Sequence, residues 1–103
     1  MTISEYQKTV DRWISSTDSG YFSPLTNMAM LCEETGEVAR VMARTYGDQK
    51  AKEGETLKLA DELADVVWIV AAIANQTGID LTDAIEANIK KKNSRDRERF
   101  NKE

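Results

Sequence analysis

The stretch from Leu63 to Ala74 limits what this chain can fold into more than any other part. It reads as a helix whose residues are apolar on every face, and Asp65 is its only charged residue. A helix that is apolar all round is a buried one, and this run is too short to span a membrane. It therefore needs neighbours on all sides, which a 103-residue chain supplies poorly. We expect a homo-oligomer, a dimer or tetramer, in which a second subunit completes the bundle.

Helical spacing of apolar residues continues through most of the chain. The sequence predicts helices over 2–14, 24–46, from 55 or 56 to 77, and 80–92. Thr2 and Glu5 have the spacing of a capping box, Ser23-Pro24 is a helix start signal, and Gly47 and Gly78 are stop signals. No alternating strand pattern is present. The predicted fold class is all-α, of the four-helix-bundle type and completed by oligomerisation.

Composition places the chain among soluble globular proteins. It is 41% hydrophobic and 31% charged, and its 103 residues suffice for a single domain over residues 1–103. The single cysteine, Cys32, excludes an intrachain disulfide and is expected to be a small buried hydrophobe in a reducing compartment. The segment Met1–Glu5 lacks the pattern of a secretory signal. A cytoplasmic location is the expectation.

Charge is distributed unevenly along the chain. The net charge is −4, but residues 90–103 carry +4, so residues 1–89 carry −8. An acidic body is unsuited to nucleic acid, and no segment is long and apolar enough for a membrane. We therefore expect neither as a partner. The basic tail over 93–103 is predicted to extend the last helix or to fray.

Two acidic pairs at helical spacing are the chief candidates for chemistry. Glu34 and Glu37 lie one turn apart on one predicted helix, and Glu62 and Asp65 lie one turn apart on the next. Four carboxylates around one point favour a bound hard cation, Mg²⁺ or in its place Mn²⁺. The chain has no histidine, which excludes triads and zinc sites that depend on it. Glu33 is positioned to orient or deprotonate a water.

A plainer interpretation is a solvated acidic helix face, which is what most surface glutamates form. The matched second pair, the apolar neighbours of Asp65 and the scarcity of nearby cations favour a metal site instead. Trp13 and Trp68 are interpreted as core residues. For Tyr21-Phe22 two interpretations stay open, a lid on the core or the wall of a pocket.

The acidic motifs resemble those of a known family. Glu33-Glu34-Thr35-Gly36-Glu37 with Glu62-Leu63-Ala64-Asp65 is similar to the paired signature of the MazG-like nucleoside triphosphate pyrophosphohydrolases. The resemblance extends over roughly residues 3–100. Supporting matches to short, single-domain members are Tyr21-Phe22, Ala74-Asn75-Gln76 and Lys91-x-Asn93-x-Arg95-Asp96.

This resemblance implies an all-α, Mg²⁺-dependent enzyme that works as a dimer or tetramer. Such enzymes split the bond between the α- and β-phosphates of a (deoxy)nucleoside triphosphate, giving the monophosphate and pyrophosphate, and they clean the nucleotide pool. By resemblance, Glu33 is the water activator or a ligand of a second metal. The implied metal ligands are Glu34, Glu37, Glu62 and Asp65.

The resemblance also implies substrate contacts near the end of the chain. Lys91 and Asn93 match positions that meet the nucleotide or its phosphates, and Asn88 stands where many members place a lysine. Two alternatives from other classes remain. One is a protein that binds nucleotide through the metal without turnover, and the other is a helical interaction module whose acidic face meets a basic partner.

Overall fold

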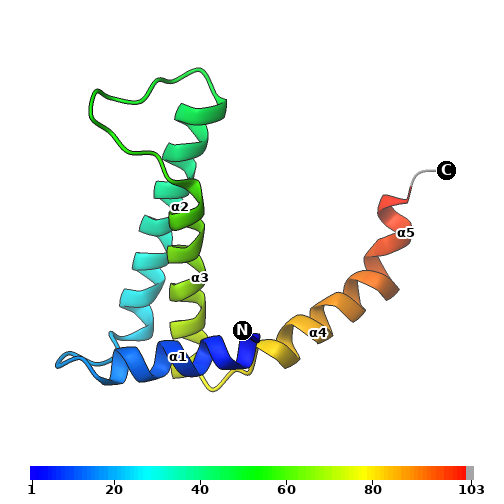
Figure 1. The fold of residues 1–103 in the computed structure, drawn as a ribbon. Coiled ribbons are helices and arrows are strands. Elements are labelled where there is room, and N and C mark those ends of the chain that lie inside the picture. Colours follow the sequence, from blue (N-terminus) through cyan, green and yellow to red (C-terminus); the bar gives the residue numbers. More distant parts are fainter. Residues whose placement is uncertain (102–103) are drawn as a thin grey trace.

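The computed structural model describes residues 1–101, and every element in this range is helical (Figure 1). The elements are α1 (Ile3–Ser15), α2 (Pro24–Tyr46), α3 (Leu59–Gln76), α4 (Leu81–Lys91), the π-helical turn η1 (Lys92–Asp96) and α5 (Arg97–Phe100). The predicted all-α class is confirmed. No helix among these residues has the length and apolar character needed to cross a membrane. The last two residues of the predicted basic tail lie outside the described range.

The body of the molecule is an antiparallel pair of helices crossed by a third. Helices α2 and α3 run side by side, and α1 lies across their lower ends in Figure 1. The core sits at the crossing of α1 and α3, where Val10 and Ile14 of α1 pack with Ala71 and Ala72 of α3. Small residues on α3 allow this close approach. The crossing brings the loop before α2 next to the C-terminal end of α3, where the Gln76 side chain donates to the Phe22 carbonyl.

Helix ends form where the sequence predicts them. The Thr2 side chain accepts from the Glu5 amide, and the Glu5 carboxylate accepts from the Thr2 amide, which is the expected capping box. Ser23 caps α2 with Pro24 in the first turn. Gly78, just past the end of α3, has a φ of 74°, a conformation that glycine adopts without steric cost.

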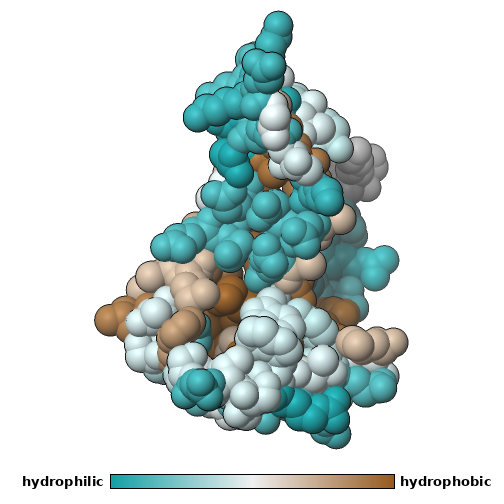
Figure 2. All heavy atoms as spheres, turned by 60° about the vertical axis from the view of Figure 1, so that its left-hand side comes forward, coloured by the Kyte–Doolittle hydropathy of each residue, from teal (hydrophilic) through white to brown (hydrophobic). Residues whose placement is uncertain are grey.

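One predicted boundary is wrong. Helix α3 begins at Leu59 rather than at residue 55 or 56, so the connection from α2 spans residues 47–58. The cause is Glu55, whose carboxylate accepts a hydrogen bond from the Lys52 amide and pairs with Arg40 and Arg44 of α2. These contacts hold Glu55 in the loop. Figure 2 shows this end of the molecule, at the top, as almost wholly hydrophilic.

The apolar surface of the body is not covered within one chain. Leu63, Val67 and Val70 of α3 are 48%, 51% and 38% exposed, so the prediction that α3 is buried all round is wrong for a single chain. Cys32, expected to be buried, is exposed as well. The Cα radius of gyration is 17.1 Å, against about 13 Å for a compact domain of this length. The fold is therefore open.

The C-terminal part forms an arm that leaves the body. Figure 1 shows α4, η1 and α5 continuing away from α2 and α3, while the start of α4 packs beside α1 and places Leu81 against the core. None of the residues in α4, η1 or α5 is buried. Ile85 and Ile89 of α4 expose 40% and 52% of their surface. The arm is thus amphipathic and lacks a partner for its apolar side in one chain.

Candidate active site

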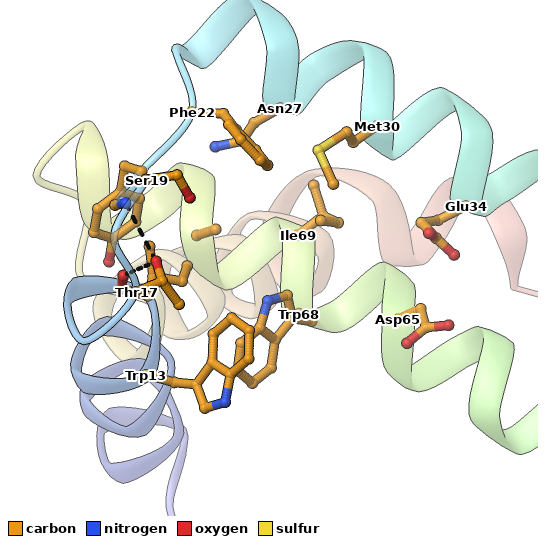
Figure 3. A pocket seen from close by; sticks show the side chains of 14 residues that line it. Trp13, Thr17, Ser19, Phe22, Asn27, Met30, Glu34, Asp65, Trp68 and Ile69 are labelled. Carbon is orange, nitrogen blue, oxygen red and sulfur yellow. Dashed lines mark hydrogen bonds between the residues drawn. The ribbon is translucent and has the colours of Figure 1, made fainter.

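Three carboxylates from two helices meet at the middle of the α2–α3 pair. Glu34 of α2 and Glu62 and Asp65 of α3 each offer an oxygen atom, and these atoms all lie within 4.8 Å of one another. Figure 3 shows Glu34 and Asp65 facing each other across the gap between their helices. The antiparallel packing produces this arrangement, because it sets one turn of α2 against one turn of α3. Three of the four predicted metal ligands are therefore brought together.

The surroundings of this cluster favour a positive charge. Burial raises the pKa of Glu34 above its ordinary value, and the negative charges of Asp65, Glu62, Glu37 and Glu33 raise it further. Among residues 1–101, no cationic side chain pairs with the carboxylates of Glu34, Glu62 or Asp65, and no hydrogen bond reaches them. The charge of Glu62 still contributes to the raised pKa of Arg40. Converging oxygen donors that make no ion pair fit a hard divalent cation.

Asp65 is more exposed than the sequence suggests. The apolar run around it predicts a buried carboxylate, yet Asp65 is exposed, while Glu34 and Glu62 are partly buried. The reason is that one chain covers only part of the surface of α3. An exposed carboxylate keeps its contact with water, so its charge costs little free energy by burial. A bound cation is therefore favoured at Asp65 by the neighbouring carboxylates of Glu34 and Glu62.

Glu37, the fourth predicted ligand, is engaged elsewhere. Its Oε2 lies 2.7 Å from Nη2 of Arg40, and Arg40 also pairs with Glu55 in the loop. The hydrogen bond and charge of Glu37 raise the pKa of Arg40. The spacing of Glu37 and Arg40, three residues apart on a helix, makes this pair visible in the sequence, whereas the contribution of Glu55 comes from a loop and is not.

Glu33 lies outside the three-carboxylate group and is exposed. It is adjacent to Glu34 in the chain, so its side chain leaves α2 about 100° away. Its charge still acts on the site, since it contributes to the raised pKa of Glu34. A position beside the cluster suits a residue that acts on water, and the assignment of Glu33 as water activator stays a prediction.

A cavity of about 360 Å³ adjoins the carboxylates. In Figure 3, Glu34 and Asp65 form one end, and the loop before α2 forms the other. The rings of Trp13 and Trp68 meet edge to face at 5.4 Å between centroids. The lining is formed by Trp13, Ile14, Thr17, Ser19, Gly20, Tyr21, Phe22, Asn27, Met30, Glu34, Asp65, Trp68, Ile69 and Ala72.

This cavity bears on two of the sequence interpretations. Tyr21 and Phe22 both line it, as the pocket-wall interpretation expects, and Tyr21 also packs against the core, as the lid interpretation expects. Trp13 lines the cavity with 59% of its surface exposed, so it is not a core residue. Trp68 is partly buried and also packs against Tyr6 and the core. Asn27, buried on α2, lines the cavity too and was not identified from the sequence.

The predicted substrate-contact residues lie apart from the cluster. Asn88 and Lys91 are on α4 and Asn93 is in η1, all exposed. Figure 1 shows this arm pointing away from the α2–α3 pair. Within one chain the structure does not bring these residues to the carboxylates.

Comparison with known proteins finds relatives that span nearly the whole chain. YpjD of Bacillus subtilis, which carries no assigned function in that comparison, is 39% identical over 100 residues, covering 96% of this chain and 90% of its own length. YvdC of the same organism, likewise without assigned function, is 26% identical over 98 residues, covering 88% of this chain and 92% of its own length.

Solved structures share the fold. The crystal structure of Bacillus subtilis YpjD, provisionally described as a pyrophosphatase, superposes with a TM-score of 0.82 at 38% identity, covering 91% of this chain and 97% of that one. A MazG protein conserved in Bacillus, described as a nucleotide pyrophosphohydrolase, gives a TM-score of 0.79 at 38% identity, covering 92% of each chain. Residues 22–100 match the MazG nucleotide pyrophosphohydrolase domain, and this chain belongs to that family.

Proposed function

We propose that this chain is a Mg²⁺-dependent hydrolase that splits the α–β phosphate bond of (deoxy)nucleoside triphosphates, releasing the monophosphate and pyrophosphate. The observation that carries the proposal is the cluster of Glu34, Glu62 and Asp65 beside a cavity with aromatic walls. Mg²⁺ commonly takes carboxylates together with substrate phosphates as its ligands. Removal of unwanted nucleotides from the pool is the role we propose.

The chain's own residues divide the work at this site. Glu34, Glu62 and Asp65 would hold the cation, and Glu37 joins them once it leaves Arg40. When bound, Mg²⁺ would polarise the phosphoryl oxygens and make a nearby water more acidic. Glu33 orients that water and accepts its proton. The cavity holds the nucleoside and excludes bulk solvent from its apolar walls.

We further propose that the active form is a homo-oligomer, with a dimer as its basic unit. Helix α2 carries an exposed row at alternating three- and four-residue steps, as in a coiled-coil seam: Leu25, Met28, Cys32, Thr35, Ala39 and Met42. Helix α3 adds Leu63, Val67 and Val70. Two such helix pairs face to face make a four-helix bundle.

The surface area supports the same proposal. The accessible surface is 8025 Å², whereas a folded monomer of 11.6 kDa exposes roughly 5,800 Å². The excess is large enough for an obligate interface. Asn88, Lys91 and Asn93 would then become substrate contacts through the dimer, because the arm that bears them leaves its own body and would reach the second copy.

The deciding assay measures pyrophosphate release from a panel of canonical and modified dNTPs, with Mg²⁺ and with excess chelator. We expect turnover only with the cation, and pyrophosphate rather than orthophosphate as the product. Mg²⁺-dependent nucleotide binding without release of pyrophosphate across the panel would instead support the non-catalytic binding protein.

A thermal measurement separates the hydrolase and the non-catalytic binding protein, which both need the metal site, from a purely structural module. A cation that binds the folded site raises the melting temperature, so Mg²⁺ should stabilise the wild-type protein. In Glu34→Gln the metal-free protein should melt higher than wild type, since a repelled carboxylate is removed, and Mg²⁺ should no longer shift it. If Mg²⁺ leaves the wild-type melting temperature unchanged, the metal site is refuted.

A further inference from the structure

The end of the cavity away from the carboxylates contains a buried amide. Asn27 is 4% exposed and lies two helical turns before Glu34 on α2, which is about 11 Å along the helix axis. A nucleoside monophosphate has a similar reach from the outer edge of its base to its phosphate. A nucleotide whose phosphates lie at Glu34 and Asp65 would therefore bring its base to Asn27.

Hydrogen bonds determine which way this amide points. Nε2 of Gln76 donates to the backbone carbonyl of Phe22 at 2.9 Å, and a carbonyl can only accept. Gln76 must therefore turn its Oε1 to Asn27, and Nδ2 of Asn27 donates to it at 2.8 Å. The nitrogen of Asn27 is thus assigned without ambiguity.

This chain of bonds leaves Oδ1 of Asn27 as an acceptor with no donor among the described residues. In the same part of the chain, the fully buried side-chain nitrogen and oxygen atoms that lack a hydrogen-bond partner are Nε of Arg40 and Nε of Arg44. Oδ1 of Asn27 is not among them and therefore keeps some contact with solvent, and the cavity is an opening that Asn27 lines. An acceptor in an apolar pocket discriminates well between ligands, because an unmatched polar group there is costly.

The other walls of the cavity suit a planar aromatic occupant. Phe22 is 48% exposed beside Asn27, and Trp13 exposes its ring at the opposite wall. Bases stack on exposed aromatic side chains and gain binding energy from them. The carboxylates occupy only one end, so the aromatic end is free for the base.

We propose that Asn27, held by Gln76, makes this enzyme prefer bases with an exocyclic amino group, cytosine and adenine, over their oxo counterparts. The group that reaches furthest from the sugar is the one on C4 of a pyrimidine or C6 of a purine. An amino group there donates to Oδ1 of Asn27, whereas an oxo group sets two acceptors against each other. This inference rests on the proposed nucleotide substrate.

The first test compares substrates that differ at that one group. The value of kcat/KM is measured for dCTP against dUTP and for dATP against dITP. For each ring size that is turned over, we expect the amino member to be preferred by about tenfold or more. Equal rates within a pair, or a preference for the oxo member, would overturn the proposal.

Variants then ask whether Asn27 is the cause. Asn27→Ala should reduce the preference to less than about threefold while pyrophosphate release continues. Gln76→Met frees the amide to rotate and should also relax the preference, with a smaller loss of the amino substrate. Asn101→Ala removes an exposed amide on the arm and should leave the preference at the wild-type value. Full discrimination in a folded Asn27→Ala or Gln76→Met protein would refute the role of Asn27.

A binding measurement without metal separates this inference from the proposed function. Trp13 and Trp68 line the cavity, so their fluorescence reports its occupancy by dCMP or dUMP in the presence of chelator. We expect dCMP to bind about tenfold more tightly than dUMP. Tighter binding of dCMP without any hydrolysis of triphosphates would defeat the proposed function alone. Hydrolysis of triphosphates with equal binding of the two monophosphates would defeat this inference alone.

Discussion

The two faces of α2 differ in a way that is opposite to an ordinary globular protein. The face toward α3 carries Glu34, which meets acidic residues of α3, and Asn27, which bonds to Gln76. The face toward solvent carries Leu25 and Met28, which are among the most exposed apolar residues of the body. Beside the buried Val41, these polar groups point inward, whereas Leu25 and Met28 point outward. We take this inversion as support for a site on one side of α2 and for a second copy on the other, both as proposed above.

The inversion has a physical cost on both faces. Carboxylates that repel one another at the inner face raise the free energy of the folded chain unless a cation binds. Exposed apolar rows at the outer face forgo roughly 25 cal/mol for each Å² that stays in water. A cation and a second subunit would remove these two costs separately. The two faces should therefore respond to different perturbations.

The inner face should show the largest effect. Asp65→Asn removes one of three converging oxygen charges, and we expect pyrophosphate release to fall by at least about 100-fold with loss of Mg²⁺ binding, since even residues that only support a metal ligand are worth 10- to 100-fold. The circular dichroism spectrum should stay helical. Asp61→Asn, an exposed acid on the same helix and outside the cluster, is the control and should keep wild-type activity. Activity retained in Asp65→Asn would contradict the metal assignment.

Substitutions at the outer face should weaken dimer formation. Val67→Asp places a charge at the centre of the proposed interface, and we expect the dissociation constant of the dimer to rise by at least about 100-fold, because an unpaired charge is costly to bury. Analytical ultracentrifugation measures this. Thr56→Asp adds the same charge in the exposed loop and should not affect assembly. A wild-type protein that sediments only as an 11.6 kDa species would show that the outer face has no partner.

Substitutions in the arm should have a smaller effect, on substrate affinity. This effect depends on both faces of α2, because the arm is proposed to reach the site of a second copy. If Lys91 contacts the triphosphate, Lys91→Ala removes a charge-assisted contact, and KM should rise about tenfold with a smaller change in kcat. Steady-state kinetics at fixed Mg²⁺ gives both values. Lys50→Ala, which removes a loop lysine of equal charge, provides the comparison. An unchanged KM in Lys91→Ala would remove the arm from the site.

The smallest effect concerns the loop between α2 and α3, residues 47–58. The hydrogen bond from the Lys52 amide, and then the charges of Arg40 and Arg44, lower the pKa of Glu55. A carboxyl with a lowered pKa stabilises the fold above its ordinary pKa of about 4.3, and that stability is lost as the pH falls through the lowered value. Glu55→Gln should therefore melt lower than wild type at pH 7, with the difference vanishing in acid.

The loop offers its own control for this measurement. Glu53 is exposed in the same segment and makes no ion pair with any residue in the described range. Glu53→Gln should melt like wild type at every pH. A Glu55→Gln protein with the wild-type melting temperature at neutral pH would show that the ion pairs of Glu55 with Arg40 and Arg44 do not stabilise the fold.

Features that depend on neighbouring residues could be predicted from the sequence. The caps at Thr2 and Ser23 and the stop at Gly78 use bonds within one turn of a helix, so they follow from local chemistry. The two acidic pairs were visible for the same reason, since residues three apart share a helix face. Grouping the two pairs around one point was a prediction from their matched spacing, and the structure brings together Glu34, Glu62 and Asp65 of the four.

Features that join distant residues could not be predicted in this way. Glu55 stays out of α3 because it pairs with Arg40, fifteen residues earlier. Asn27 and Gln76, 49 residues apart, form a bond that no spacing rule indicates. The engagement of Glu37 with Arg40 also changes which carboxylates converge, although that pair lies within one helix.

The sequence by itself determined the helices and most of their ends, because periodicity and capping act over a few residues, and its acidic motifs indicated the family of this chain. Only the tertiary structure decided that the apolar row of α2 faces solvent, that Asp65 is exposed, and that Asn27 lines the cavity. These properties depend on which surface of one helix meets another. The apolar pattern marks a surface for burial but does not say whether the same chain or a second copy will bury it.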